Sequence, residues 1–288
     1  MFAVEYKSYQ ELVESFLSNL PWGEDLLNES MRYSLLGGGK RIRPVLALAA
    51  GAALGGRTEQ ILPAACALEL IHTYSLIHDD LPAIDNDDYR RGKLSNHKVF
   101  GEGMAVLAGD ALLTYAFELL AEPLPIPPER QLQAVREVAA AVGKSGMVLG
   151  QVQDLAGEEN SLSLDEIENI HKAKTGALLV AAARLGAILA GGSKEEVKAF
   201  TLYAQALGLA FQIKDDILDV EGDSETLGKP AGSDVRQHKA TYPSLLGLEG
   251  AKEHLQEQIV QAKRALQPLG QSAAFLSGLA DYIAQRQY

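Results

Sequence analysis

Apolar residues recur along most of the chain at the spacing of helices. The runs are rich in Ala and Leu rather than in Val and Thr, which favours helix over strand. The chain contains no Asn-Gly or Asp-Gly dipeptide of the kind that joins hairpin strands, and no sustained period-two alternation. The pattern predicts an all-α protein with helical runs at 63–81, 103–122, 130–155, 164–190, 194–220 and 250–266.

Groups of glycine and proline separate these runs. They lie at 37–39, 55–56, 123–128 and 191–192. Ser163 with Glu166, and Ser193 with Glu196, have the spacing of a capping box and mark two helix starts. No segment is long enough to separate two domains. We therefore predict one domain over residues 1–288, a bundle of roughly ten or more helices around a central apolar cavity, with several helices buried on more than one face.

Composition and charge narrow the range of functions. Hydrophobic residues make up 47% of the 288 residues, which is enough for a sizeable core. The formal net charge of −12 argues against binding of nucleic acid, which needs a basic surface, and favours binding of cations. Anionic substrates would require positive charge concentrated at one place.

The cellular setting is indicated by what the chain lacks. Cys66 is the only cysteine, so no internal disulfide can form and no zinc-ligand spacing exists, and we expect Cys66 to be a core residue. The first residues, MFAVEYKSYQELVESF, carry acids and lack the apolar core of a signal peptide. No uncharged apolar run reaches about 18 residues. We expect a cytoplasmic protein with no membrane span.

Two clusters of aspartates each end an apolar helical run. They are, in chain order, Asp79, Asp80 and Asp85, then Asp215, Asp216 and Asp219. Gln212 and the three acids of the second cluster fall at i, i+3, i+4 and i+7, on one stripe of a helix. Like charges packed so closely destabilise a helix unless a cation compensates, and oxygen ligands alone select a hard ion such as Mg²⁺. Solvated acidic helix ends are the alternative, but two such clusters favour a diphosphate held between them through Mg²⁺.

Several groups of cations match a diphosphate. Gly37–Gly39 precede Lys40, Arg41 and Arg43; glycines let backbone N–H groups approach an anion, and arginine offers a planar fork to phosphate oxygens. The spacing is not that of a Walker motif, and a flexible basic turn is the alternative. Further candidates are Arg90 and Arg91, His72, Lys174 with Thr175, Lys229 and Lys239.

Each of these candidates has a plainer interpretation. Arg90 and Arg91 follow an acidic run at 85–88 and could simply balance its charge. His72 lies two helical turns before Asp79 on the same face, which suits a substrate contact, but a structural histidine fits equally well. Lys174, Lys229 and Lys239 are isolated cations, and none is specific by itself.

Taken together, these motifs resemble those of the trans-type polyprenyl diphosphate synthases, and within them the bacterial farnesyl diphosphate synthases. The matching segments are GGGKRIRP, HDDLPAIDNDDYRRG, GQVQDL, HKAKTGAL, FQIKDDILD and LGKPAGSD, and the similarity runs from about residue 30 to the C-terminal YIAQRQY. The resemblance implies a homodimer of the isoprenoid synthase fold that uses Mg²⁺ and two small-molecule diphosphates. The order of six motifs makes it specific.

The resemblance also implies a role for each residue. Metal ligands would be Asp79, Asp80, Asp85, Asp215 and Asp219, with Asp216 in support. Isopentenyl diphosphate would contact Lys40, Arg43, His72 and Arg91. The allylic diphosphate would contact Arg90, Lys174, Thr175, Gln212 and Lys229, with Lys239 as a further addition. The acids other than Asp219, together with Lys174 and Thr175, would be the catalytic residues, and the role of Lys214 is left open.

The expected chemistry needs no protein nucleophile. An allylic diphosphate ionises, Mg²⁺ and cations stabilise the charge on the leaving oxygen, the alkene of isopentenyl diphosphate attacks, and the released pyrophosphate accepts a proton. A dry, apolar cavity would protect the carbocation from water. The chain contains no Ser-His-Asp or Cys-His signature that would ask for covalent catalysis.

Product length should depend on what lies beneath the first cluster. Tyr74 and Ser75 precede Asp79 by five and four residues, and at about 1.5 Å per residue Tyr74 lies roughly 7.5 Å along the helix. An aromatic ring there, with the longer first motif, predicts the fifteen-carbon farnesyl diphosphate in the resembling family. The alternatives are an ordinary core role for Tyr74, a geranylgeranyl diphosphate synthase, a class I terpene cyclase, or a non-catalytic subunit that would be expected to have lost its aspartates.

Overall fold

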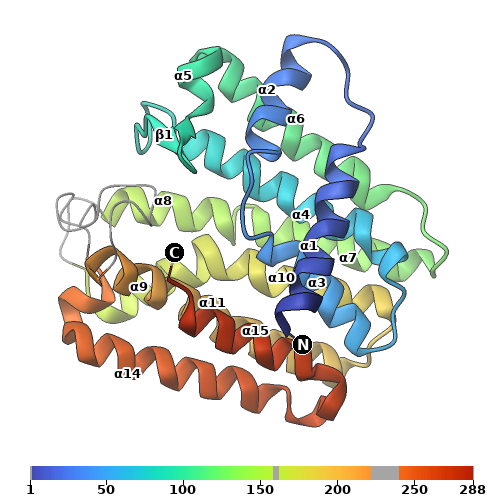
Figure 1. Cartoon of the computed structure of the whole chain (residues 1–288), viewed down its shortest axis with the longest axis vertical. Coiled ribbons are helices and arrows are strands. Elements are labelled where there is room, and N and C mark those ends of the chain that lie inside the picture. Colours follow the sequence, from blue (N-terminus) through green and yellow to red (C-terminus); the bar gives the residue numbers. More distant parts are fainter. Residues whose placement is uncertain (1, 158–161, 222–239, 288) are drawn as a thin grey trace.

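The computed structural model describes residues 2–157, 162–221 and 240–287, and helices dominate these ranges (Figure 1). The helices are α1 (Phe2–Ser18), α2 (Leu26–Leu35), α3 (Ile42–Ala53), α4 (Thr58–Asp79), α5 (Asn96–Phe100), α6 (Glu102–Ala121), α7 (Pro128–Val142), α8 (Met147–Gly157), α9 (Leu164–His171), α10 (Ala177–Ala190), α11 (Lys194–Glu221), α14 (Tyr242–Ala265) and α15 (Ala274–Gln285). A π-helical turn η1 (Lys172–Gly176) joins α9 to α10, and a 3-10 turn η2 (Gln267–Ala273) precedes α15. The all-α prediction is confirmed.

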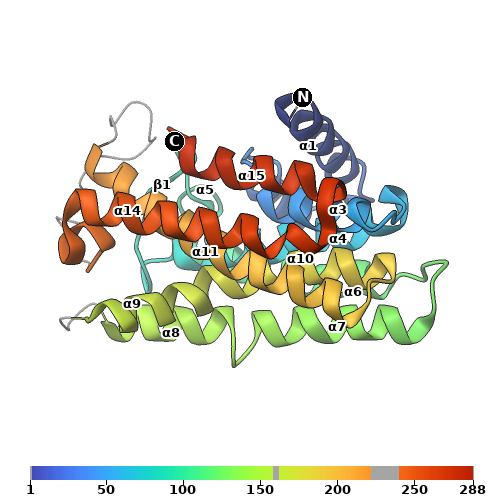
Figure 2. The ribbon, with the colours of Figure 1, turned by 90° about the horizontal axis from the view of Figure 1, so that it is seen from below.

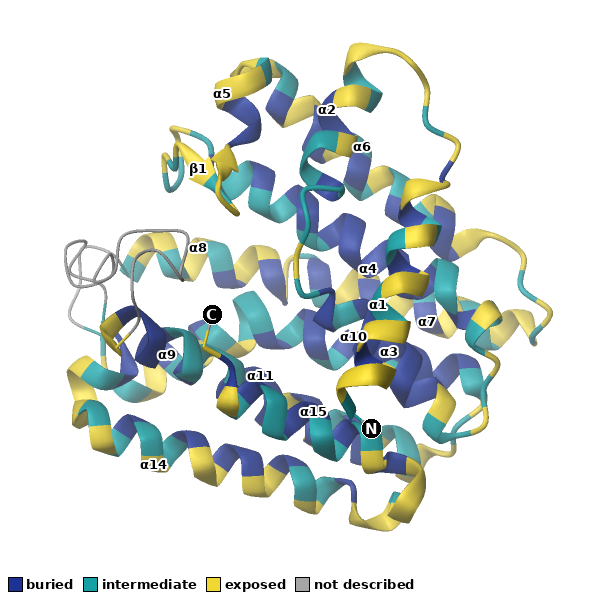
Figure 3. Ribbon diagram, in the orientation of Figure 1, coloured by how far each residue is buried: buried dark blue, intermediate teal, exposed yellow. Residues whose placement is uncertain are grey.

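The helices are stacked in layers around a buried centre. Figure 2 shows α7, α8 and α9 along one side, α10 and α11 in the middle, and α14 and α15 on the opposite side. The central helices α3, α4, α10 and α11 are predominantly buried, whereas α14 and α8 expose an outer face to solvent (Figure 3). Helices buried on more than one face cannot show a single polar stripe, which explains why their apolar runs were so continuous in sequence.

Small residues allow the central helices to approach each other closely. A Cβ atom on Gly186 of α10 would lie 1.9 Å from the carbonyl oxygen of Ala47 in α3. A Cβ atom on Gly109 of α6 would lie 2.2 Å from Nε2 of His78, near the end of α4. Gly186 therefore sets the distance at which α10 packs on α3, and Gly109 leaves room for the His78 side chain near the end of α4, where the first aspartate cluster lies.

The predicted element boundaries hold in most places. Ser163 and Glu166 form the expected capping box at the start of α9. The Ser193 backbone N–H donates to Glu196 Oε2 at 2.7 Å, and the Glu196 N–H donates to Ser193 Oγ at 3.2 Å, as predicted for the start of α11.

Two local predictions were wrong. The run 130–155 is two helices, because one helix ends at Val142 and the next begins at Met147. A short hairpin also pairs β1 (Tyr89–Arg90) with β2 (Lys93–Leu94). Its turn residues Arg91 and Gly92 have φ of 54° and 74°, so a mirror-image turn forms without the Asn-Gly or Asp-Gly dipeptide on which the sequence argument relied.

Three described stretches are long and apolar enough to cross a membrane by length and composition. They are α4, α6 and Leu164–Ala190, and the shares of their apolar windows buried inside the protein are 67%, 39% and 61%. Burial in the bundle accounts for the apolar character of the first and third. The expected absence of a membrane span stays a prediction.

The glycine packing between α3 and α10 predicts opposite effects of one added methyl group at two sites. Gly186→Ala should lower the free energy of unfolding by about 1–3 kcal/mol, because the methyl group collides with a backbone oxygen. Gly103→Ala in α6, where nothing lies within 4 Å of the new Cβ, should raise it by about 0.4–1 kcal/mol. Denaturant unfolding followed by circular dichroism measures both, and equal stabilities of the two variants would contradict the close approach.

Candidate active site

The first aspartate cluster lies where α4 ends. Asp79 is the last residue of α4, and Asp80 is its C-cap, with 2% of its surface exposed. The chain then folds back, and the Asp85 N–H donates to the Asp79 carbonyl at 2.8 Å. This turn brings Asp85 back toward Asp79 and Asp80, and both of the other acids act on the pKa of Asp79.

Burial makes Asp79 an unusual carboxyl group. It raises the pKa of Asp79 to about 6; the positive charge of Lys174 opposes the shift, and the negative charge of Asp85 adds to it. A raised pKa means that nearby positive charges stabilise the carboxylate less than water would. The position therefore suits a bound cation.

The two arginines after the first cluster have different partners. The Arg90 guanidinium donates from Nε to Asp80 Oδ1 at 2.8 Å and also contacts Asp87 at 3.2 Å. Arg91 occupies the hairpin turn and donates from Nη1 to the carbonyl of Gly38. Arg90 thus balances the charge of neighbouring aspartates, which was the plainer of its two interpretations from sequence. Arg91 instead links the hairpin to the glycine turn.

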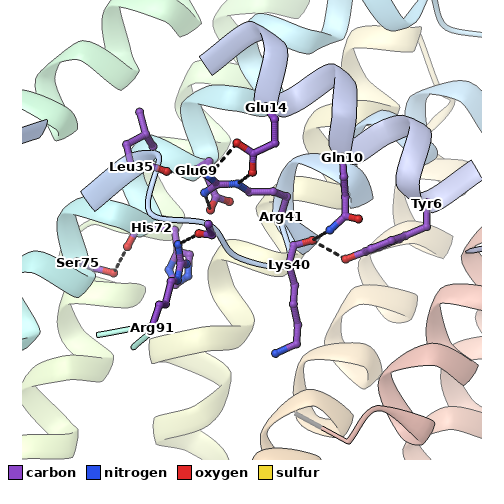
Figure 4. A network of polar contacts seen from close by, with 11 residues as sticks. Tyr6, Gln10, Glu14, Leu35, Lys40, Arg41, Glu69, His72, Ser75 and Arg91 are labelled. Carbon is purple, nitrogen blue, oxygen red and sulfur yellow. Dashed lines mark hydrogen bonds and ion pairs between the residues drawn. The ribbon is translucent and has the colours of Figure 1, made fainter. Parts of the chain in front are cut away.

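The glycine turn is held from behind by a buried arginine. Arg41 has a left-handed φ of 53°, and its side chain is 0% exposed. Its Nε donates to Glu14 Oε1 of α1 at 2.7 Å, its Nη1 to Glu69 Oε1 of α4 at 2.7 Å, and its Nη2 to the Leu35 carbonyl at 2.7 Å (Figure 4). The motif's three cations are therefore unequal: Arg41 is structural, which the sequence did not reveal.

The same network fixes the backbone of Lys40. Its carbonyl accepts the Tyr6 hydroxyl at 2.5 Å and Gln10 Nε2 at 3.1 Å, and its side chain runs away from α1 (Figure 4). Burial lowers the pKa of Lys40, and the charge of Arg286 lowers it further, whereas Asp215 acts in the opposite direction. The Lys40 ammonium therefore lies within electrostatic reach of the second aspartate cluster.

Arg43 forms a positive wall together with Lys40, and His72 adjoins this wall. Burial lowers the pKa of Arg43 to about 10, with Arg91 adding to the shift and Glu69 opposing it. Burial also lowers the pKa of His72, and Arg43 and Arg91 lower it further. His72 is thus a neutral imidazole among arginines, able to hydrogen-bond an anion without adding charge.

Lys174 and Thr175 lie in the π-helical turn η1. Lys174 Nζ forms an ion pair with Asp154 Oδ2 of α8 at 2.6 Å. Burial lowers the pKa of Lys174, but the attraction of Asp154 outweighs it, so the net pKa is raised. A Cβ atom on Gly150 would lie 2.2 Å from the Lys174 backbone nitrogen. The GQVQDL segment thus supplies both the close approach and the partner of Lys174, roles that the sequence did not assign.

The second aspartate cluster lies in the last turns of α11, and its members differ. Asp215 Oδ1 accepts Arg286 Nη2 at 2.7 Å, and its side chain is 42% exposed. Asp216 is 7% exposed and accepts the backbone N–H of Tyr242 at 3.0 Å, at the start of α14. Asp219 is 3% exposed. Asp216 thus positions α14, and Asp215 is the member most open to a ligand.

The remaining predicted site residues are placed as follows. Gln212 and Thr175 are partly buried on α11 and η1. Tyr74 is 6% exposed in α4, with its ring centre 5.6 Å from that of His78, and Ser75 Oγ donates to the His72 carbonyl at 2.9 Å. Lys229 and Lys239 lie outside the described residues.

Each acidic cluster acts electrostatically on some of the predicted cations. Lys174 acts on the pKa of Asp79, and Asp215 acts on those of Lys40 and Arg43. Among the described residues, no group of three or more His, Cys, Asp or Glu side chains is close enough to hold a metal ion. Mg²⁺ ordinarily takes only one or two carboxylates and completes its shell with water and phosphate oxygens. The donor set of oxygens around an under-compensated Asp79 fits Mg²⁺ bound together with a diphosphate.

Known proteins resemble the chain over most of its length. The chain is 51% identical over 268 residues to a farnesyl diphosphate synthase of Geobacillus stearothermophilus, covering 92% of this chain and 90% of that one. It is 52% identical over 265 residues to geranylgeranyl pyrophosphate synthase 7, chloroplastic, of Arabidopsis thaliana, covering 91% of this chain and 76% of that one. The solved structure of an FPP/GFPP synthase from Zymomonas mobilis superposes with a TM-score of 0.86 at 40% identity, covering 98% of each chain.

The fold is therefore that of the isoprenoid synthases, and the chain is a prenyltransferase. It belongs to the polyprenyl synthetase family, which matches residues 24–272. The resemblance of its motifs is confirmed.

The buried Arg41 predicts a large loss of stability when its charge is removed. Arg41→Met should lower the free energy of unfolding by about 3–5 kcal/mol, because Glu69 would remain as a buried, uncompensated charge. Glu14, whose side chain is 40% exposed, provides the matched comparison, and Glu14→Gln should cost about 1 kcal/mol or less. Chemical denaturation measures both. A loss for Arg41→Met no larger than that for Glu14→Gln would contradict the structural role of Arg41.

Proposed function

We propose that the protein condenses isopentenyl diphosphate with dimethylallyl diphosphate, and then with geranyl diphosphate, to form farnesyl diphosphate. The observation that carries this proposal is the pairing of an acidic helix end, Asp79 to Asp85, with a separate positive wall of Lys40 and Arg43 that neutral His72 adjoins. An allylic substrate and an isopentenyl substrate need two different diphosphate sites. A class I terpene cyclase needs one, so the positive wall favours the synthase.

Mg²⁺ fits the acidic side of the site. Asp79, Asp80 and Asp85 would hold it from the end of α4, and Asp215 and Asp219 from α11, with Asp216 fixing the backbone nearby. Bound there with the allylic diphosphate, Mg²⁺ would neutralise charge on the leaving oxygen. The pair Lys174–Asp154, at 2.6 Å, holds the lysine ammonium where its charge acts on the pKa of Asp79.

The chain's own residues bind and orient the substrates. Lys40, Arg43 and Arg91 would hold the diphosphate of isopentenyl diphosphate, and neutral His72 would donate a hydrogen bond to it. Lys174, Thr175 and Gln212 would surround the allylic diphosphate, with Arg90, Lys229 and Lys239 as the further contacts predicted from sequence. In this arrangement, the alkene faces the allylic carbon, and the released pyrophosphate takes up the proton.

The farnesyl product is supported by Tyr74. Its ring is buried in α4 five residues before Asp79, and the charge of Asp79 adds to the burial that raises the pKa of Tyr74 to about 12. The ring is thus close beneath the acidic helix end, where it would limit the growing chain. Relatives named as geranylgeranyl pyrophosphate synthases make the twenty-carbon product the second candidate.

A homodimer is supported by the exposed apolar side of α6, α7 and α8. Leu107 is 57% exposed, Leu132 61% and Val152 56%. These helices lie along one side of the bundle (Figure 2). A second copy is the occupant we propose for this face. A cytoplasmic setting is supported by the single buried thiol of Cys66.

The raised pKa of Asp79 predicts pH-dependent metal binding. Metal needs the ionised carboxylate, so affinity should be full well above pH 6 and should fall as the pH drops through about 6, where Asp79 takes up a proton. Below that point we expect about a tenfold loss per pH unit. Substrate-free titration with Mn²⁺ in place of Mg²⁺, followed by electron paramagnetic resonance, avoids titration of the diphosphate. Asp79→Asn should abolish this pH dependence, and an affinity that is flat from pH 5 to pH 8 would contradict it.

The product assignment is tested by chain length. Incubation of the protein with Mg²⁺, isopentenyl diphosphate and dimethylallyl diphosphate should yield a fifteen-carbon product by chromatography with mass spectrometry. Tyr74→Ala removes the ring and should extend the product to twenty carbons or more, whereas Tyr74→Phe keeps the ring and should leave it at fifteen. If Tyr74→Ala also stops at fifteen carbons, the ring is not the limit. If the unaltered protein makes twenty carbons, it is a geranylgeranyl diphosphate synthase.

A further inference from the structure

The last described residues of the chain bring an arginine onto the second aspartate cluster. The backbone N–H of Arg286 donates to the Tyr282 carbonyl at 2.9 Å, which caps α15 and directs the side chain. Arg286 Nη2 donates to Asp215 Oδ1 at 2.7 Å and to the Phe211 carbonyl at 2.9 Å. The guanidinium carbon lies 4.1 Å from the centre of the Phe211 ring, and the side chain is 3% exposed. Figure 1 shows this end of the chain beside α11. Arg286 is thus docked on α11 by an ion pair, a hydrogen bond and a ring contact.

A guanidinium and a divalent ion compete for the same carboxylate. Both seek the lone pairs of Asp215, and each raises the cost of placing the other nearby. The surroundings are already positive. Burial lowers the pKa values of Lys40 and Lys214, and the charge of Arg286 lowers both further. A divalent cation at Asp215 would therefore meet three positive side chains, and Arg286 is bonded directly to the carboxylate.

We propose that the Arg286 guanidinium pairs with the Asp215 carboxylate until a metal ion displaces it, and that metal binding releases the C-terminal segment from α11. The inference rests on the proposed function, in which Asp215 is a metal ligand. By linkage, the docked segment weakens metal binding by the same factor by which metal weakens docking. Arg286 is a positioning residue: it touches the ligand Asp215 and takes no part in the chemistry.

Substrate-free metal binding tests the competition. The full chain is titrated with Mn²⁺ in place of Mg²⁺, and free Mn²⁺ is measured by electron paramagnetic resonance, so that turnover contributes nothing. Arg286→Gln should bind Mn²⁺ roughly threefold to tenfold more tightly, whereas Arg286→Lys keeps the charge and should stay near the unaltered protein. Arg264→Gln makes the same charge change at an exposed position near the end of α14 and should have no effect. Removal of residues 286–288 should reproduce the gain of Arg286→Gln.

Protease sensitivity tests the release itself. Trypsin cleaves after Arg286, and mass spectrometry detects the loss of the last two residues. Saturating Mn²⁺ should speed this cleavage several-fold, and Asp215→Asn should be cleaved fast with or without Mn²⁺.

The outcomes separate this inference from the proposed function. Unchanged or weaker Mn²⁺ binding in both Arg286→Gln and the shortened chain would overturn the competition. Equal cleavage of the unaltered protein with and without Mn²⁺ would overturn the release. If Asp215→Asn binds Mn²⁺ as the unaltered protein does, Asp215 is not a metal ligand, and the proposed metal site is at fault instead.

Discussion

The ion pairs of Arg41 are the contact on which the positive wall depends. Arg41 takes a left-handed φ of 53°, and its side chain turns onto Glu14 and Glu69. One guanidinium thus joins α1, the end of α2 and α4 through four hydrogen bonds, a planar arrangement that a lysine could not reproduce. The turn that carries Lys40 and Arg43 is thus anchored from behind, by contacts that leave the guanidinium of Arg41 on the side of α1 and α4.

The site holds charge that the protein leaves incompletely compensated. Burial raises the pKa of Asp79 and lowers those of Arg43 and His72, so the surroundings disfavour the charged form of each group. A structure optimised for stability alone would pair these groups directly, as Arg41 pairs with Glu69. Instead the acids gather at the end of α4 and the cations on the glycine turn. In the proposed function, a metal ion would compensate the acids and a diphosphate the cations, so bound ligands would complete the electrostatics.

The sequence predicted the helical bundle because its apolar runs were long and its capping boxes were local. Ser163 needs only Glu166 three residues away, and both can be read in one line. The predictions from sequence failed where the position of a residue depends on packing against residues far away in the chain. The π-helical turn around Lys174 packs closely on Gly150 of α8, and no spacing within HKAKTGAL shows this. Arg41 and Arg286 were missed for the same reason: their partners lie 28 and 71 residues away in sequence.

The two aspartate clusters look alike in sequence but differ in what holds them. In the first, Asp80 is neutralised locally by Arg90, and Asp79 is half-buried and makes no ion pair within the described ranges. In the second, Asp216 is committed to the start of α14, and Asp215 lies on the exposed side under Arg286. The acids of the second cluster all lie on α11, but the contacts that hold Asp216 and Asp215 come from the start of α14 and from the end of the chain. The acids of the first cluster lie at the end of α4 and in the turn after it, and Arg90 of β1 holds Asp80 there. The two motifs therefore share a double aspartate in sequence, whereas the packing around each carboxylate decides which of its oxygen atoms a ligand can reach.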